Sequence, residues 1–247
     1  MKKSFLRPIA LLFTLLFTLT ASAQRKTDEF TTQSGKKIVI TCIKHASIEI
    51  NYNGTEIEVD PVGMWMKPET DYATFPKANI ILVTHEHKDL FDRAAIAEVR
   101  SPATSIYVNP AVFGYYKNGL VMRNGESRKY ADDILIEAVP AYNYTPEHQQ
   151  FHPQGRDNGY VLTLDGFRIY IAGDTEDIPE MADLKDIDVA FLPCNQPYTM
   201  TVEQCANAAK IIRPKVLFPY HYSDTPIHKL SMQLAGSGID VRIRDYK

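Results

Sequence analysis

Two histidines and an aspartate lie close together in Thr84–Asp89, whose sequence is Thr-His-Glu-His-Lys-Asp. Histidines at positions i and i+2 of a loop can turn both imidazoles toward one point, and the carboxylate of Asp89 can join them. Imidazole and carboxylate together suit zinc and related divalent metals. The same spacing also occurs in polar loops with two solvated histidines, so it indicates a metal centre only in the company of further ligands.

The further possible ligands stand in loops or at the ends of predicted strands. Two aspartates close strands in Glu-Val-Asp-Pro and Ala-Gly-Asp-Thr, and four more histidines fall in loops or at strand ends. Ligands delivered from several strand ends are how a rigid scaffold assembles a metal centre. These candidates are His45, His148, His152, His221, Asp60 and Asp174, whereas His228 lies on a predicted helix surface, where a solvated role is expected.

The elements that must position these residues are mainly strands in the first half of the chain, and strands alternating with helices later. Asn53-Gly54 and Asp165-Gly166 are typical of tight turns between strands. The pattern favours the α/β (α+β) class, with two mixed β-sheets and helices outside, in one domain over 24–247. Residues 24–35 read as a polar stretch. The predicted helices are 92–100, 201–212 and 227–234, and the predicted strands are 37–42, 46–52, 55–60, 79–84, 105–108, 134–139, 160–164, 167–172, 188–192, 215–219 and 240–244.

Residues 1–23 are typical of a secretory signal peptide. A basic start with Lys2, Lys3 and Arg7 precedes an apolar run over 9–19, and small residues precede a cleavage point at Gln24. A membrane anchor is the alternative, but the apolar run is about half of the roughly 20 residues needed to span a bilayer. We therefore expect an exported chain, periplasmic or extracellular, with no transmembrane segment after the cleavage point.

Composition narrows the class of partner. The formal net charge is −3, and it becomes −6 without the three basic residues of 1–23. An acidic chain without a basic cluster argues against nucleic acid, so a small-molecule substrate is expected, with the oligomeric state left open. Three cysteines fit poorly with a disulfide framework. Cys42 and Cys205 are predicted to be small core residues, and Cys194 stands near the candidate site loops.

Taken in order along the chain, these motifs resemble those of the metallo-β-lactamase fold superfamily. Within it, the chain looks most like lactonase-type metal-dependent hydrolases related to the ascorbate-6-phosphate lactonases. The resemblance runs from about Lys37 to the C-terminus and implies a four-layer αββα sandwich. Its markers are Lys44-His45-Ala46-Ser47, Val59-Asp60-Pro61, Thr84–Asp89, Phe151-His152-Pro153, Ala172–Thr175 and Pro219-Tyr220-His221-Tyr222.

The resemblance also implies two neighbouring metal positions that share one carboxylate. The implied ligands are His85, His87 and His152 (or His148 in its place) for the first metal, Asp174 for the bridge, and Asp89 and His221 for the second metal.

Three further residues are expected around this centre. Asp60 would orient a ligand histidine, as carboxylate partners of metal-binding histidines do. His45 would lie near the substrate side of the cleft or, alternatively, be a structural histidine bonded to the backbone at a strand start. Tyr198 would line the cleft or pack as a loop aromatic.

Leu90 departs from the family pattern, which usually continues with Asp-His after His-x-His-x. The second metal then keeps Asp89, Asp174 and His221, which is enough for a zinc ion with an open position. We therefore expect one firmly bound divalent metal and a second that is weak or absent. Zinc is the first choice, with manganese, nickel and iron as alternatives.

The implied activity is hydrolysis of a small-molecule lactone, ester or phosphoester. A bound divalent metal lowers the pKa of its water from about 15.7 to about 7. Asp89, or Asp174 if one metal is present, would orient or deprotonate that water. A β-lactamase fits less well, because Asp174 stands where those enzymes would be expected to use cysteine. The alternative from another class is a non-catalytic metal- or ligand-binding envelope protein with a degenerate second site.

Overall fold

The structure, a computed structural model, describes residues 25–65 and 67–246, so the signal peptide predicted for 1–23 lies outside the described residues. Two sheets of seven strands each make up most of it. The first sheet contains β1 (Thr27–Thr31), β2 (Lys37–Lys44), β3 (Ser47–Tyr52), β4 (Thr55–Val59), β5 (Ile80–Leu82), β6 (Ser105–Val108) and β7 (Leu120–Val121), side by side in that order. The second contains β8 (Ser127–Ala131), β9 (Ile134–Ala141), β10 (Asp157–Leu164), β11 (Phe167–Ile171), β12 (Val189–Pro193), β13 (Val216–Tyr220) and β14 (Asp240–Val241).

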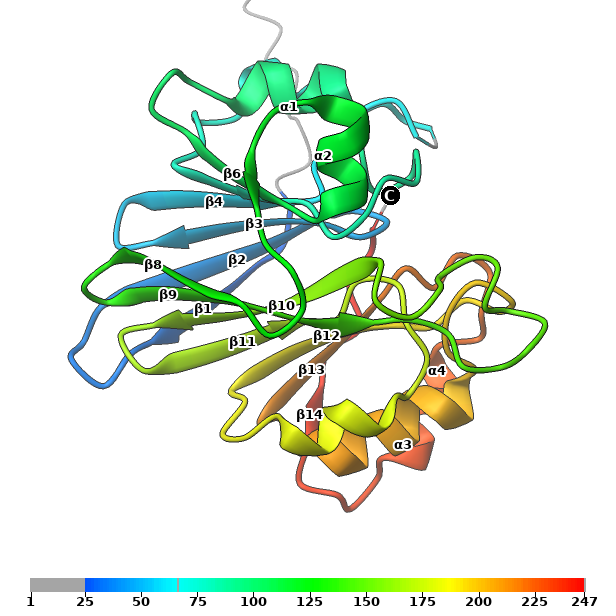
Figure 1. Ribbon diagram of the computed structural model, residues 1–247. Helices are drawn as coiled ribbons and strands as arrows, with labels where there is room; N and C mark the ends of the chain where they lie inside the picture. Colours follow the sequence, from blue (N-terminus) through cyan, green and yellow to red (C-terminus); the bar gives the residue numbers. More distant parts are fainter. Residues whose placement is uncertain (1–24, 66, 247) are drawn as a thin grey trace, which may run out of the picture.

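Both sheets are mixed in the same way. β1 to β4 pair antiparallel and β4 to β7 parallel, and β8 to β11 pair antiparallel and β11 to β14 parallel. Helices α1 (Arg93–Val99) and α2 (Pro110–Tyr116) lie outside the first sheet, and α3 (Val202–Ile212) and α4 (His228–Gln233) lie outside the second (Figure 1). Two short 3₁₀ segments, Tyr72–Thr74 and Pro179–Asp183, complete the elements. The predicted four-layer sandwich is confirmed.

Local chemistry explains several of these boundaries. Asn53 and Gly54 both have positive φ, and so do Asp165 and Gly166, as the tight turns of both predicted hairpins require. The predicted helices at 92–100 and 201–212 form, each with a side-chain cap at its start.

Four strands or helices, β1, β7, β8 and α2, escaped prediction because each is short or exposed, and so did the two 3₁₀ segments. Strand β7 has only two residues. The stretch read as polar contains β1, an edge strand that buries only Asp28 fully. Strand β8 is exposed over its first three residues, and α2 buries only Val112. Little apolar periodicity marks any of them in the sequence.

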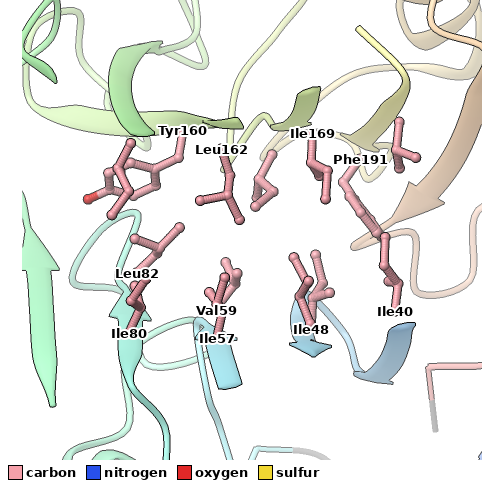
Figure 2. Close-up of a cluster of buried hydrophobic side chains, with 14 of the residues drawn as sticks. Ile40, Ile48, Ile57, Val59, Ile80, Leu82, Tyr160, Leu162, Ile169 and Phe191 are labelled. Carbon is pink, nitrogen blue, oxygen red and sulfur yellow. The ribbon is translucent and has the colours of Figure 1, made fainter. Parts of the chain in front are cut away.

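The main core lies between the two sheets. Apolar side chains from both sheets point at one another across the gap, and the labelled ones are fully buried. Figure 2 shows Ile40, Ile48, Ile57, Val59, Ile80 and Leu82 of the first sheet facing Tyr160, Leu162, Ile169 and Phe191 of the second. Burial of these apolar side chains away from water holds the two sheets together. The ends of their strands therefore give the connecting loops a rigid support.

The three cysteines are buried and free, as the sequence predicts for Cys42 and Cys205, and Cys194 is also buried. Within 25–65 and 67–246, none of the helices has the length and apolar character to cross a membrane.

Candidate metal centre

The candidate ligands gather where strands of both sheets end. His45 follows β2, His85 comes three residues after β5, Asp174 comes three residues after β11, and His221 follows β13. His152 lies in the loop that joins β9 to β10. These strands belong to a packed double sheet, so the side chains are delivered to one place by rigid elements.

The first ligand group consists of His85, His87, His152 and Asp174, whose ligand atoms all lie within 4.8 Å of one another. The Oδ2 of Asp174 is 3.7 Å from the Nε2 of His85 and 3.4 Å from the Nε2 of His152. His85 Nε2 and Asp174 Oδ1 are buried, and neither has a hydrogen-bond partner in the described part of the chain. Buried polar atoms are normally paired, so these two, facing a cluster of imidazoles, fit a divalent cation.

Asp60 acts on this group through Thr84. The backbone N–H and the hydroxyl of Thr84 donate to the two carboxylate oxygens of Asp60, at 2.8 and 2.9 Å. The Nδ1 of His85 lies 3.0 Å from the same hydroxyl oxygen, to which it donates, since the hydroxyl proton is already directed to Asp60. The Nε2 of His85 therefore keeps its lone pair for a metal. Asn109 fixes the loop further by donating to the Thr84 carbonyl.

His152 is oriented by a carboxylate that the sequence reasoning missed. Its Nδ1 lies 3.0 Å from Asp157 Oδ2, and both residues are buried. Arg156 holds Asp157 from the other side at 2.7 and 2.9 Å, and also pairs with Glu86 at 3.4 Å. A carboxylate partner of this kind fixes the ring and leaves Nε2 as the ligand atom. The available signal was an acidic residue at the start of a strand, five positions after the histidine.

The second ligand group consists of His45, Asp89 and His221, again within 4.8 Å of one another. The Nε2 atoms of His45 and His221 each lie 3.3 Å from Asp89 Oδ2, and the two rings are in contact, with centroids 3.9 Å apart and planes tilted by 45°. His221 Nε2 is also 3.2 Å from Asp174 Oδ2. Asp174 thus stands between the two groups, at the position of the implied bridge.

Burial favours the neutral form of three of the imidazoles. It lowers the pKa of His85 to about 4, and the proximity of His152 acts in the same direction. Burial likewise lowers the pKa of His87, with His152 beside it, and of His45, with His221 beside it. A neutral imidazole offers the lone pair that a metal needs.

Asp174 and His221, in contrast, favour their charged forms although both are buried. Burial alone raises the pKa of Asp174, but the neighbouring imidazoles of His221 and His85 outweigh it and hold the pKa well below its usual range. Burial lowers the pKa of His221, but Asp174 and Asp89 outweigh that and raise it to about 10. The site is therefore a concentration of negative charge that is countered by a proton on His221, and a divalent cation would compete with that proton.

Other residues singled out in the sequence lie elsewhere. His148 is outside both groups, with its Nδ1 3.1 Å from Glu176 Oε1, so His152 rather than His148 lies with His85 and His87. Tyr198 is 45% exposed, and its ring packs edge-on against Phe151. Leu90 is fully buried in the core between the sheets.

A shallow hollow of about 360 Å³ lies beside the loop that carries the ligands. It combines exposed apolar side chains with two basic ones and two acidic ones. A larger hollow of about 840 Å³, near Phe167 and Arg213, is lined neither by a candidate ligand nor by any residue of the loop 84–89. The smaller hollow includes Glu86 and Lys88 of the ligand loop but no candidate ligand itself. It is lined by Met64, Trp65, Glu86, Lys88, Phe91, Asp92, Arg93, Ala94 and Tyr115.

Comparison with known sequences places this geometry in context. Residues 39–221 match the family model described as the beta-lactamase superfamily domain. A UPF0173 metal-dependent hydrolase from Ligilactobacillus salivarius is 32% identical over 195 residues, covering 76% of this chain and 86% of that protein. A UPF0173 metal-dependent hydrolase from Anoxybacillus flavithermus is 29% identical over 192 residues, covering 74% and 85%.

Solved structures agree. A candidate metal-dependent hydrolase from Parabacteroides distasonis is 54% identical, with a TM-score of 0.87, covering 91% of this chain and 100% of that one. A metallo hydrolase from Ignicoccus hospitalis shares the fold at 23% identity, with a TM-score of 0.70 and coverage of 84% and 95%. The segment matched by the family model includes every member of both ligand groups and ends at His221.

Proposed function

Because the chain belongs to the beta-lactamase superfamily and is a metal-dependent hydrolase of that fold, we propose that it is an exported enzyme acting on a small-molecule lactone, ester or phosphoester. The observation that carries the proposal is the pair of ligand groups that meet at Asp174. Their nitrogen and oxygen donors fit zinc first, with manganese, nickel and iron as alternatives. A divalent cation held there supplies a water of lowered pKa and polarises the carbonyl or phosphoryl oxygen of the substrate.

Asp89 is the residue that we assign to orienting the attacking water. Its side chain is 22% exposed against 2% for Asp174, so water and substrate reach it from solvent. Burial alone raises the pKa of Asp89, but hydrogen bonds from His221 and His45 outweigh it and hold the pKa well below its usual range. The carboxylate is therefore ionised at neutral pH and accepts a hydrogen bond from the water. Asp174, which is buried, fixes the ligand histidines around it.

The hollow beside Lys88 supports a small substrate with an apolar part. Trp65 and Met64 are exposed on its wall and offer apolar contact, while Lys88 and Arg93 offer positive charge. A substrate with a negatively charged or strongly polarised group next to a hydrophobic one would match this lining. Phosphoesters and acidic lactones are of this kind.

A substrate screen on the purified chain tests the proposal. Reporter lactones, esters and phosphodiesters are offered with added zinc or manganese, with a β-lactam reporter for comparison. We expect turnover of at least one lactone, ester or phosphoester reporter that a chelator abolishes and added metal restores. Turnover that persists after complete metal removal, or no turnover in any class, contradicts the proposal.

Export rests on the leader features of residues 1–23 and has its own test. Mass spectrometry of the protein recovered from the cell envelope or the medium should find a chain that begins at Gln24. An envelope-localised chain that keeps Met1 would overturn this part of the proposal and leave the enzymatic part untouched.

A further inference from the structure

The place usually taken by an imidazole, after Asp89, is filled here by Leu90. Its side chain is fully buried in the core between the sheets and has no donor atom. The ligands that the sequence motifs supply to the second group are therefore Asp89, the shared Asp174 and a single imidazole, that of His221.

The structure brings a second imidazole to this group from a different strand. His45, directly after β2, directs its Nε2 to the same oxygen of Asp89 that His221 approaches, with both nitrogens at 3.3 Å. His45 is 5% exposed and His221 is 2% exposed. Two imidazole nitrogens thus converge on one carboxylate oxygen, with Asp174 Oδ2 3.2 Å from the second imidazole.

The backbone holds both histidines in an uncommon conformation to achieve this. His45 has φ of 50° and His221 has φ of 47°, in the left-handed region that residues with side chains rarely occupy. The N–H of His221 donates to the carbonyl of His45 at 3.0 Å, and the N–H of His45 donates to the carbonyl of Tyr246 at 3.1 Å. Such conformations persist where surrounding contacts enforce them, and they concentrate at functional sites.

We propose that His45 replaces the imidazole missing at Leu90 and completes a second divalent-metal position with Asp89, Asp174 and His221. Two imidazoles and two carboxylates form a four-ligand set of the kind that zinc and manganese accept. The sequence-based expectation of a weak or absent second metal counted only three ligands, and His45 supplies the fourth. The inference rests on the proposed function in assuming a metal centre, but it concerns the number of metals and not the reaction.

The test counts zinc in the purified full chain and in two variants. His45→Asn and His45→Gly remove the imidazole while accepting the left-handed backbone, because asparagine and glycine tolerate positive φ. His228→Asn is the matched control, since His228 is exposed on α4. Each protein is saturated with zinc, freed of unbound metal and analysed by elemental mass spectrometry, and zinc binding is followed by calorimetry.

We expect two zinc ions per chain in the parent and in His228→Asn, and one in both His45 variants, with the affinity of the remaining ion unchanged. Circular dichroism identifies a variant that fails to fold, and the other variant then carries the test. Two zinc ions retained with unchanged affinity after loss of His45 would overturn the inference and leave His45 as a hydrogen-bond partner of Asp89. A parent chain that binds a single ion would overturn it as well.

The same measurements separate this inference from the proposed function. Loss of one zinc ion in the His45 variants supports the second position even if none of the reporter substrates is hydrolysed. Metal-dependent turnover by a chain whose zinc content is unaffected by His45 supports the function and refutes the second position.

Discussion

The two ligand groups lie side by side and share Asp174, but they are built in different ways. In the first group, His85 and His152 are each oriented by neighbouring side chains, through Thr84 and Asp157 respectively. In the second group, His45 and His221 are held mainly by backbone hydrogen bonds to one another and to Tyr246. A ligand group that is fixed by side chains close in sequence can be recognised from a sequence motif. A group that is fixed by backbone hydrogen bonds between segments far apart in sequence can be recognised only from the structure.

The second group also depends on the end of the described chain. Arg244 donates to Asp28 in β1 at 2.5 and 2.7 Å, and its carbonyl accepts from the Tyr222 hydroxyl at 2.5 Å. These contacts fix the segment that ends at Tyr246, which in turn fixes His45. We therefore expect changes near the first group to act locally and changes near the second to act at a distance.

Loss of a first-group imidazole should have the largest effect. His87→Ala removes a ligand that is only half-buried, so the fold should survive while one metal is lost. Because a catalytic metal contributes several kcal/mol to transition-state stabilisation, activity on the reporter substrate should fall by about 10³-fold or more. His148→Ala is the control, since His148 lies outside both groups. Full activity of His87→Ala would show that the first group is not the reaction centre.

Leu90→Ala should reduce stability and leave the metal content unchanged. Leu90 is fully buried between the sheets, and truncation of such a side chain typically costs about 2–5 kcal/mol in the free energy of unfolding. Urea unfolding of the metal-free chain measures this cost, and elemental analysis counts the metal. A loss of zinc without a loss of stability would mean that Leu90 belongs functionally to the second group.

Asp157→Asn should weaken the first group alone. The substitution removes the charged partner of His152, and loss of such a partner typically lowers metal affinity by about 10–100-fold. Competition with a chromophoric chelator measures the affinity of each zinc ion. Glu137→Gln is the control, because Glu137 pairs with Arg168 and touches neither group. Equal weakening of both zinc ions would contradict the separate construction of the two groups.

The sequence predicts much of the first group for a physical reason. His85 and His87 are two positions apart in a loop that follows a buried strand, and Asp174 follows the end of another, so all three are candidates for a site at strand ends. The resemblance to the metallo-β-lactamase superfamily then implies that they share one metal centre. The layered fold follows from strand and helix patterns in the same way. The sequence context favoured His152 over His148 as the third histidine ligand, and in the structure only His152 lies beside His85 and His87.

The role of His45 was not predictable in this way. It lies 44 positions from Asp89, and its approach depends on how β2, the C-terminal residues and the loop after β13 pack together. Asp157 was missed for a related reason, since an acidic residue at a strand start is common and gains meaning only from the histidine beside it. Pairwise packing over long sequence separations leaves no periodic signal, so it appears only in three dimensions.

The smallest expected effect comes from Asp28, which belongs to neither group. Burial raises the pKa of its carboxyl, but the hydrogen bonds and charges of Arg244 and Arg242 outweigh it and hold the pKa below its usual value. The ion pair therefore stabilises the folded chain above the carboxyl's unfolded pKa of about 3.9, and this contribution is lost as the pH falls through that value toward the folded pKa. Asp28→Asn should cost about 1 kcal/mol at pH 7, because the amide still accepts part of the hydrogen bonding.

Urea unfolding of the metal-free chain at pH 7 and near pH 3 measures this difference, which should shrink in acid. If Asp28 also supports the second group through Arg244 and Tyr246, the same variant should weaken the second zinc ion by about fivefold at pH 7, the equivalent of about 1 kcal/mol, and leave the first unchanged. A zinc affinity that falls at the second group and not at the first distinguishes a group held by distant backbone contacts from one held by neighbouring side chains. Equal affinities in parent and variant would confine the role of Asp28 to stability.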